Sequence, residues 1–310
     1  MKILFMGTPD FALESLRALC RNGENVIGVI TQPDKPRGRG YTLTPPPVKV
    51  YAMEQNIPVY QPSTLRGEEF AALLAELDPD LIVVAAFGKI LPQNVLDYPK
   101  HGCICVHGSL LPKYRGAAPM QRAIIDGEPV TGITTMYMDA GIDTGDMILK
   151  AEVPITPEDN FETIHDKMAA CGAVTLLRTL ESLRNGTITR EKQDDSQSNY
   201  APKIEKADCL IDFTKDAAAV HNQIRGLSPI PLSFTHTADG KLLKVTASRV
   251  VDAEKVAGPV GTVVSLDGEI VDACGRGTVA LLGVLLEGKG RMSASDFIRG
   301  RKVSVGDILQ

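Results

Sequence analysis

The sequence predicts an α/β protein, with an N-terminal, mostly parallel sheet flanked by helices and a small β-barrel near its C-terminus. Strand-like apolar runs alternate with segments of helical periodicity in the first part of the chain, which indicates parallel strands connected by helices. The run at residues 81–86 is apolar throughout, as expected for a strand buried on both faces. From residue 241 onward, short β-rich runs are separated by turn residues, which is typical of a small barrel.

The individual elements follow from the spacing of the apolar residues. In the first part we expect strands at residues 1–6, 26–31, 81–86, 102–106 and 131–137 and helices at 11–20, 48–55, 118–125 and 161–183. In the last part we expect a helix at 216–224 and strands at 243–250, 261–264, 270–273 and 279–286. A polar segment lies between the two parts and predicts a connection. We therefore expect a first domain at 1–190, a linker at 191–204 and a C-terminal barrel at 205–310.

The composition is that of a globular protein, with 44% hydrophobic and 23% charged residues among 310. The first residues lack a basic start followed by a long apolar run, so we expect neither a secretory signal nor a membrane anchor, and a cytoplasmic location. The six cysteines show no disulfide-dense pattern and are expected to be reduced. The net charge is −5, but residues 205–310 hold 13 basic and 13 acidic side chains. This relative basicity favours the C-terminal part as the one that faces phosphates.

Two stretches place polar side chains where ligand sites usually form. Residues 106–119 follow a buried strand, where the loops of parallel sheets build ligand crevices, and they contain His107. A histidine there can also serve structure alone, by satisfying loop carbonyls. Residues 132–146 run from a strand into a turn with Asp139, Asp143 and Asp146, and such aspartates often only cap turns. Their spacing lacks the alternating ligands of a calcium loop, and we expect no metal.

Taken together, a histidine followed by Ser-Leu-Leu-Pro and a downstream Asp-x-Gly-x-Asp-x-Gly resemble the folate-dependent formyltransferases over nearly the whole chain. The resemblance implies a Rossmann-like catalytic domain, an OB-like barrel and 10-formyltetrahydrofolate as formyl donor, with no metal. It makes His107 and Asp143 catalytic. It also implies folate contacts from two segments, Ser109, Leu110, Leu111 and Pro112 in one and Phe87, Gly88, Ile90 and Leu91 in the other. The apolar side chains of the second segment fit a plain core equally well.

The Arg-Gly-Ala-Ala-Pro run at residues 115–119 is similar to the branch of this family that acts on methionyl-tRNA or on amino sugars. The Gly38-Arg39-Gly40 loop and the tail after Ile204 favour the tRNA branch. The resemblance then implies methionyl initiator tRNA as acceptor, Arg39 as a tRNA contact and a monomer. A basic, Gly-rich loop is otherwise a solvated connection. The alternatives are a formyltransferase for an amino-sugar nucleotide and a catalytically weakened tRNA-binding protein.

The match breaks at Cys105, where the family has asparagine two residues before its catalytic histidine. Formyl transfer passes through an oxyanion, which a planar amide stabilises and a thiol, a weak donor, does not. Losing such a donor costs about a hundred- to a thousand-fold in rate. Four interpretations stay open: weakened catalysis, a binding protein without the reaction, replacement by another donor, or a thiol nucleophile at Cys105 beside His107.

Overall fold

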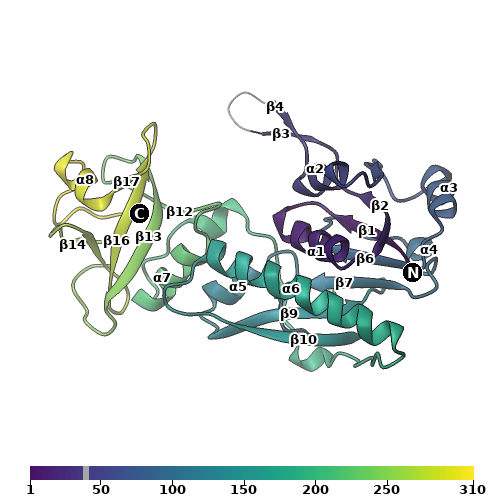
Figure 1. Ribbon diagram of the computed structural model, residues 1–310. Coiled ribbons are helices and arrows are strands. Elements are labelled where there is room, and N and C mark those ends of the chain that lie inside the picture. Colours follow the sequence, from purple (N-terminus) through teal and green to yellow (C-terminus); the bar gives the residue numbers. More distant parts are fainter. Residues whose placement is uncertain (38–41) are drawn as a thin grey trace. The chain divides into compact units, whose positions relative to one another are not determined.

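The computed structural model describes residues 1–37 and 42–310 (Figure 1). The predicted tRNA contact Arg39 lies outside the described residues. The chain forms two compact units. The first comprises residues 1–116, 130–154 and 165–200, and the second comprises residues 117–129, 155–164 and 201–310.

The first unit is built on a seven-stranded sheet with the order β10-β9-β7-β6-β1-β2-β5. Five strands run parallel: β1 (Lys2–Gly7), β2 (Asn25–Ile30), β5 (Val59–Tyr60), β6 (Leu81–Ala85) and β7 (Cys103–His107). Every residue of β6 and β7 is buried, in agreement with their continuous apolar sequences. The prediction of a mostly parallel sheet is therefore confirmed.

Two strands at one edge of this sheet run antiparallel. They are β9 (Val130–Tyr137), which pairs with β7, and β10 (Met147–Pro154), which pairs with β9. The connection from β9 to β10 spans residues 138–146. It is shorter than the roughly dozen residues that a parallel crossover requires, so the chain returns antiparallel. The edge strand β10 was not predicted, because charged residues interrupt its apolar sequence.

Helices cover the sheet of the first unit (Figure 1). They are α1 (Asp10–Arg21), α2 (Pro47–Glu54), α3 (Glu68–Leu77), α4 (Gln93–Leu96) and most of α6 (Phe161–Arg184). The helix α6 approaches β7 and β9 closely at Gly172, where a Cβ would lie 3.1 Å from the Val106 side chain. Short strands β3 (Lys35–Arg37) and β4 (Thr42–Thr44) form a hairpin, and β8 (Arg115–Gly116) pairs with β11 (Tyr200–Ala201).

The second unit is a curled antiparallel sheet with helices packed on it. The strand order is β12-β13-β16-β15-β14, with β17 paired to β16. The strands are β12 (Ser233–His236), β13 (Leu242–Asp252), β14 (Val263–Ser265), β15 (Ile270–Ala273), β16 (Thr278–Leu286) and β17 (Met292–Ser293). The helices are α5 (Pro119–Ile125), α7 (Ala217–Gly226) and α8 (Ala294–Arg299). All four strands predicted here are present. Turn-forming residues separate their short apolar runs, which made these strands recognisable in the sequence.

One apolar core holds the second unit together. Val220 and Ile224 of α7 pack with Leu243 and Leu281 of the sheet and with Phe297 of α8. Asp216 caps α7 by accepting a hydrogen bond from the Ala219 amide at 2.7 Å. Burial of large side chains of this kind stabilises the fold by about 1.5–3 kcal/mol each.

The expected linker, residues 191–204, does not belong to one unit. Residues 191–200 lie in the first unit and residues 201–204 in the second. The second unit also takes up residues 117–129 and 155–164 from the first part of the chain. Domain boundaries predicted from sequence patterns are contiguous. They therefore do not show that short segments of the first part of the chain pack with the second unit.

Candidate active site

His107 is the last residue of β7 and lies almost fully buried, with 6% of its surface exposed. Its Nε2 lies 3.0 Å from the Tyr114 carbonyl oxygen. A carbonyl only accepts hydrogen bonds, so Nε2 carries a proton and donates it there. The other ring nitrogen, Nδ1, lies 3.6 Å from Oδ2 of Asp143. The structure thus brings the two predicted catalytic residues together from positions 36 apart in sequence.

Asp143 sits in the turn between β9 and β10, with a left-handed backbone at φ +54°. Its Oδ2 accepts a hydrogen bond from the Gly116 amide at 2.8 Å, which fixes the carboxylate beside the histidine. The 3.6 Å separation from His107 exceeds a normal hydrogen bond. Catalytic hydrogen bonds are often long in structures without substrate and tighten when it binds.

The two glycines of the Asp-x-Gly-x-Asp-x-Gly pattern lie where the turn is crowded. A Cβ at Gly145 would lie 1.8 Å from the Tyr137 carbonyl oxygen, so no side chain fits there. A Cβ at Gly141 would lie 2.0 Å from the Thr144 hydroxyl, so the Thr144 side chain would have to move. Asp139 ties the same turn together, since it accepts hydrogen bonds from the Gly141 amide at 3.0 Å and the Thr144 hydroxyl at 2.7 Å. The pattern is therefore the sequence signature of a tight turn that presents Asp143.

The Ser109-Leu110-Leu111-Pro112 segment leaves β7 directly after the histidine and is anchored by a threonine that the sequence analysis missed. Thr134 on β9 is fully buried and donates to the Ser109 carbonyl at 2.7 Å. It also accepts from the Leu111 amide at 3.0 Å. Thr134 pairs with His107 across the two strands. Only this strand register identifies Thr134 as a residue of the site, and the register cannot be read from the sequence.

The second predicted folate segment follows β6 and divides between core and surface. Phe87 and Leu91 are each 3% exposed and pack in the apolar core, whereas Ile90 is 73% exposed. Gly88 has φ +79°, a conformation that favours glycine. The Phe87 carbonyl accepts from the Gln32 amide group at 3.1 Å. The side chains of Phe87 and Leu91 thus serve the core, and the exposed part of the loop is formed by Gly88 and Ile90.

Cys105 is buried on β7 and packs against Leu111, Met136 and Met147. Burial, and secondarily the negative charge of Asp143, raise the pKa of the Cys105 thiol above its usual range. A thiol with a raised pKa stays protonated at neutral pH, and only the thiolate is a strong nucleophile. The arrangement therefore disfavours a thioester relay and leaves Cys105 as a small buried side chain with a weak donor.

The described residues hold no group of three or more His, Cys, Asp or Glu side chains arranged to bind a metal ion. Within residues 1–37 and 42–310, no helix combines the length and the apolar character needed to cross a bilayer. All six cysteines are free thiols.

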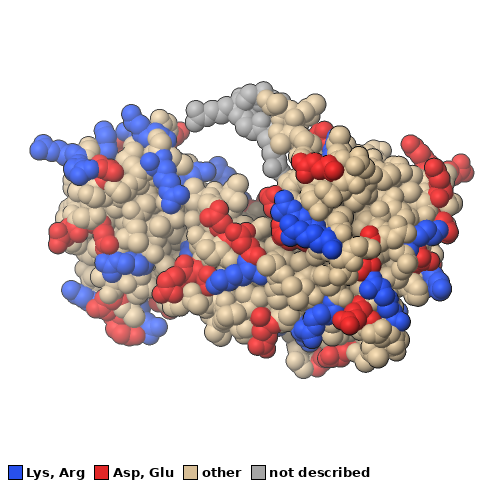
Figure 2. Space-filling view, viewed as in Figure 1, with Lys and Arg blue, Asp and Glu red and all other residues tan. Residues whose placement is uncertain are grey.

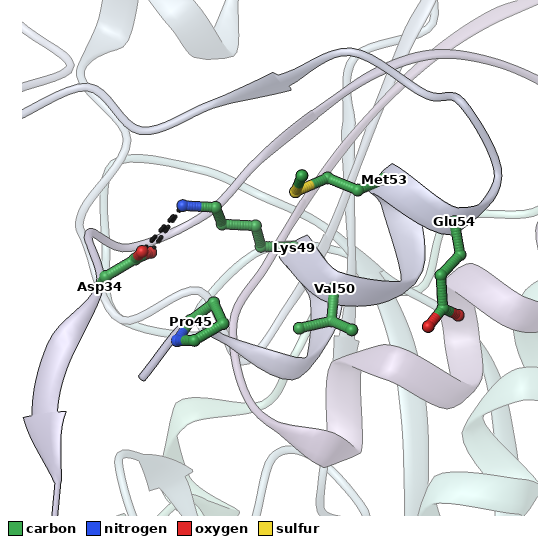
Figure 3. Close-up of a pocket in the computed structure, with 6 residues that line it drawn as sticks. All are labelled: Asp34, Pro45, Lys49, Val50, Met53 and Glu54. Atoms are coloured by element: carbon green, nitrogen blue, oxygen red, sulfur yellow. Dashed lines mark hydrogen bonds and ion pairs between the residues drawn. The ribbon is translucent and has the colours of Figure 1, made fainter. Parts of the chain in front are cut away.

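A hollow of about 490 Å³ lies beside α2 and contains none of the predicted catalytic residues (Figure 3). Figure 3 shows Lys49 reaching toward Asp34, with which it forms an ion pair at 2.9 Å. Val50 and Met53 are partly exposed there, at 42% and 61%. The hollow therefore combines exposed apolar side chains with a charged pair, and it is separate from the His107 site.

Figure 2 shows basic side chains over the second unit, several of them along its upper edge in this view, with further basic and acidic side chains below. In the sequence, Lys289, Arg291, Arg299, Arg301 and Lys302 cluster in and around β17 and α8. Each of these residues is at least partly exposed. Arg299 is engaged with Asp296 on the same helix. Exposed lysines and arginines on one face are the usual means of contacting a phosphate backbone.

Comparison with known proteins agrees with this geometry. Residues 1–180 match the family model described as formyl transferase, and residues 203–302 match the formyl transferase C-terminal domain. The chain is 49% identical to a methionyl-tRNA formyltransferase of Geobacter metallireducens, over 99% of this chain and 97% of that protein.

Two solved structures share the fold. An N-formyltransferase from Helicobacter canadensis, in complex with folinic acid and dTDP-3-aminofucose, aligns with a TM-score of 0.68 and 21% identity over 91% of this chain and 98% of that chain. HypX from Aquifex aeolicus in complex with tetrahydrofolic acid aligns with a TM-score of 0.62 and 18% identity, over 96% of this chain and 47% of that one. At these identities the likeness concerns the fold alone. The family matches and the full-length identity establish that this chain belongs to the methionyl-tRNA formyltransferase family of formyl transferases.

Proposed function

We propose that this protein transfers the formyl group of 10-formyltetrahydrofolate to the amino group of methionyl initiator tRNA. The observation that carries the proposal is the His107 and Asp143 pair beside the anchored Ser109–Pro112 turn, in a chain 49% identical over nearly its whole length to a methionyl-tRNA formyltransferase. The proposal includes a cytoplasmic location and action as a monomer.

The proposed reaction forms one C–N bond and breaks another. The methionyl amine attacks the formyl carbon, giving a tetrahedral carbon whose oxygen bears negative charge. The bond from this carbon to the folate nitrogen then breaks, and the proton lost by the amine ends on that nitrogen. The products are the formylated methionyl-tRNA and tetrahydrofolate.

His107 and Asp143 fit the proton transfer. With Nε2 committed to the Tyr114 carbonyl, Nδ1 is the nitrogen left to exchange a proton, and Asp143 lies beside it at 3.6 Å. The carboxylate stabilises the charged ring that forms when Nδ1 takes the proton from the amine. Positioned acid–base groups of this kind contribute about 10²–10⁴-fold in rate.

Cys105 determines how fast we expect formyl transfer to be. A neutral thiol donates weakly to the oxyanion. We therefore propose that this protein turns over more slowly than a formyltransferase with asparagine at this position. The proposal does not route any bond through sulfur, because the thiol has a raised pKa and is buried.

The test is transfer of labelled formyl from 10-formyltetrahydrofolate to three acceptors: methionyl initiator tRNA, uncharged initiator tRNA and an amino-sugar nucleotide. We expect label on the charged tRNA alone. Label on the sugar nucleotide and not on the tRNA would replace the proposed acceptor. Absence of label on all three, with charged tRNA retained in filter binding, would indicate a binding protein.

A further inference from the structure

The segment at residues 191–199, expected from its polar composition to be a linker, is attached to the active-site region at four points, one of which is the 2.8 Å ion pair of Asp195 with Arg115. Glu191 exchanges two backbone hydrogen bonds with Met147 at the start of β10, at 2.8 and 2.9 Å. Asn199 accepts from the Tyr114 amide through its side chain and from the Arg115 amide through its carbonyl, the latter at 3.1 Å. All of these residues belong to the first unit.

The third attachment is Gln193. It is the one buried residue of this polar segment, with 6% of its surface exposed. Its amide nitrogen donates to the carbonyl oxygens of Asp143 and Gly145, each at 2.8 Å. Its amide oxygen accepts from Nε of Arg115 at 2.9 Å. Both donor hydrogens and the acceptor of this side chain are therefore used.

The two carbonyls that Gln193 holds are those of the turn that presents the catalytic carboxylate. Asp143 has a left-handed backbone, which costs a non-glycine residue about 1–2 kcal/mol and persists only where the surroundings enforce it. The amide group bonds the carbonyl of Asp143 itself and that of the obligatory glycine two residues later. It thereby fixes the direction in which the Asp143 side chain leaves the turn.

We propose that Gln193 is a positioning residue for formyl transfer, which holds the Asp143 carboxylate in register with His107 through its two hydrogen bonds to the turn. The proposal rests on the proposed function for its kinetic consequence. It makes the residue 191–199 segment a part of the active-site support and not a passive connection.

The test compares three variants of the full chain. Gln193→Met keeps the length of the side chain and removes every hydrogen bond. Gln193→Glu keeps the acceptor for Arg115 and removes both donors. Gln197→Met alters an exposed glutamine of the same segment, whose amide contacts only Asp194 on its own turn. Gln197 lies outside the proposed machinery and serves as the matched control.

We expect Gln193→Met and Gln193→Glu to lower kcat by similar factors, on the order of a hundredfold, because small misplacements of a catalytic group cost this much. We expect KM for both substrates to change by less than about threefold, since the loss concerns the transition state alone. Gln197→Met should match the unmodified chain. If Gln193→Glu retains full kcat while Gln193→Met does not, the residue acts through Arg115, and the proposal is overturned. Equal kcat in all variants overturns it as well.

A second measurement separates this proposal from the proposed function. Amide hydrogen exchange of a peptide covering residues 138–147 reports on the turn directly, with no need of turnover. Gln193→Met and Gln193→Glu should accelerate exchange in this peptide, and Gln197→Met should not. If the unmodified chain transfers no formyl but the exchange pattern holds, the function fails and the positioning role stands. If exchange is unchanged in both Gln193 variants, the positioning role fails whatever the activity.

Discussion

The two units differ in how particular buried polar side chains are bonded. In the first unit, the buried polar side chains near His107 are hydrogen-bonded: Thr134 makes two bonds and Gln193 makes three. In the second unit, Asp272 on β15 is completely buried, and neither carboxylate oxygen has a hydrogen-bond partner among the described residues. Bonded polar groups fix the backbone of a site, whereas an unbonded one only destabilises the fold around it.

Two buried glutamines make the contrast specific. Gln223 on α7 donates to the carbonyls of Asp208 and Leu210, at 2.9 and 2.7 Å, much as Gln193 donates to the Asp143 turn. Its amide oxygen has no partner in the described part of the chain. Gln193 is satisfied at every polar side-chain atom and holds the left-handed Asp143, the predicted catalytic carboxylate. Two buried glutamines thus have different roles. Gln193 supports the turn of the candidate active site, and Gln223 holds the loop at Asp208 and Leu210.

The largest effect expected is on the catalytic pair. Asp143→Asn should lower kcat by about 10²–10⁴-fold, because it removes the charge beside His107. Asparagine tolerates the left-handed backbone and can still accept from the Gly116 amide, so the melting temperature should stay close to that of the unmodified chain. Single-turnover transfer of labelled formyl measures the effect. A loss below about tenfold would remove Asp143 from the mechanism.

The next effect in size concerns Cys105. Cys105→Asn should raise turnover by up to about a hundred- to a thousand-fold, equivalent to roughly 2.7–4 kcal/mol, by supplying an oxyanion donor. The larger amide must displace neighbouring Met136 or Met147, which reduces the gain. The same transfer assay measures it.

Cys105→Ala is the companion variant. It removes both the weak donor and any nucleophilic sulfur, and we expect only a small further loss. Complete loss of turnover in Cys105→Ala, with no gain in Cys105→Asn, would instead establish a thiol nucleophile.

A smaller effect, on stability, is expected from Asp272. Burial raises the pKa of this carboxyl well above its ordinary value of 3.8, so the folded chain retains a proton that the unfolded chain releases. The contribution of Asp272 to the free energy of unfolding of the second unit should therefore be fully present below about pH 4 and be lost as the pH rises through the folded pKa. Asp272→Val should remove this decline and stabilise the unit at neutral pH by about 1–3 kcal/mol.

Urea unfolding of the second unit between pH 4 and 8 measures this effect. Burial raises the pKa of Cys274, two residues along the chain, to about 12, so this thiol does not titrate in that range. An identical pH profile in Asp272→Val and the unmodified chain would show that Asp272 finds a partner in solution.

The smallest effect is expected from an exposed pair in the same unit. Arg249 and Glu269 form an ion pair across the surface of the sheet, with side chains 51% and 31% exposed. Glu269→Gln should change the free energy of unfolding by about 0.2–1 kcal/mol, because water screens such pairs. Urea titration in low and in high salt checks it. An effect as large as that of Asp272→Val would mean that charge, and not burial, decides the stability of this unit.

Much of the architecture followed from the sequence. Every strand and helix predicted in the first part is present, because buried parallel strands such as β6 require unbroken apolar runs. The elements that were not predicted there include the short β3, β4, β5, β8 and α4, the strand β10, and α3, whose apolar residues were not assigned to a helix. The sequence also contained the Asp-x-Gly-x-Asp-x-Gly turn, in which the Tyr137 carbonyl leaves no room for a side chain at Gly145.

The support of the site depended on tertiary structure. Thr134 and Gln193 lie 25 and 50 residues from the groups that they hold, Ser109 and Asp143. A hydrogen bond over such a separation leaves no local pattern, since a buried glutamine and an exposed one look alike in sequence. By itself the sequence determined the class of fold and the turn that presents Asp143, and it predicted His107 and Asp143 as the catalytic pair. Only the tertiary structure decided which polar side chains are buried and bonded, because burial depends on strand register and packing between distant segments.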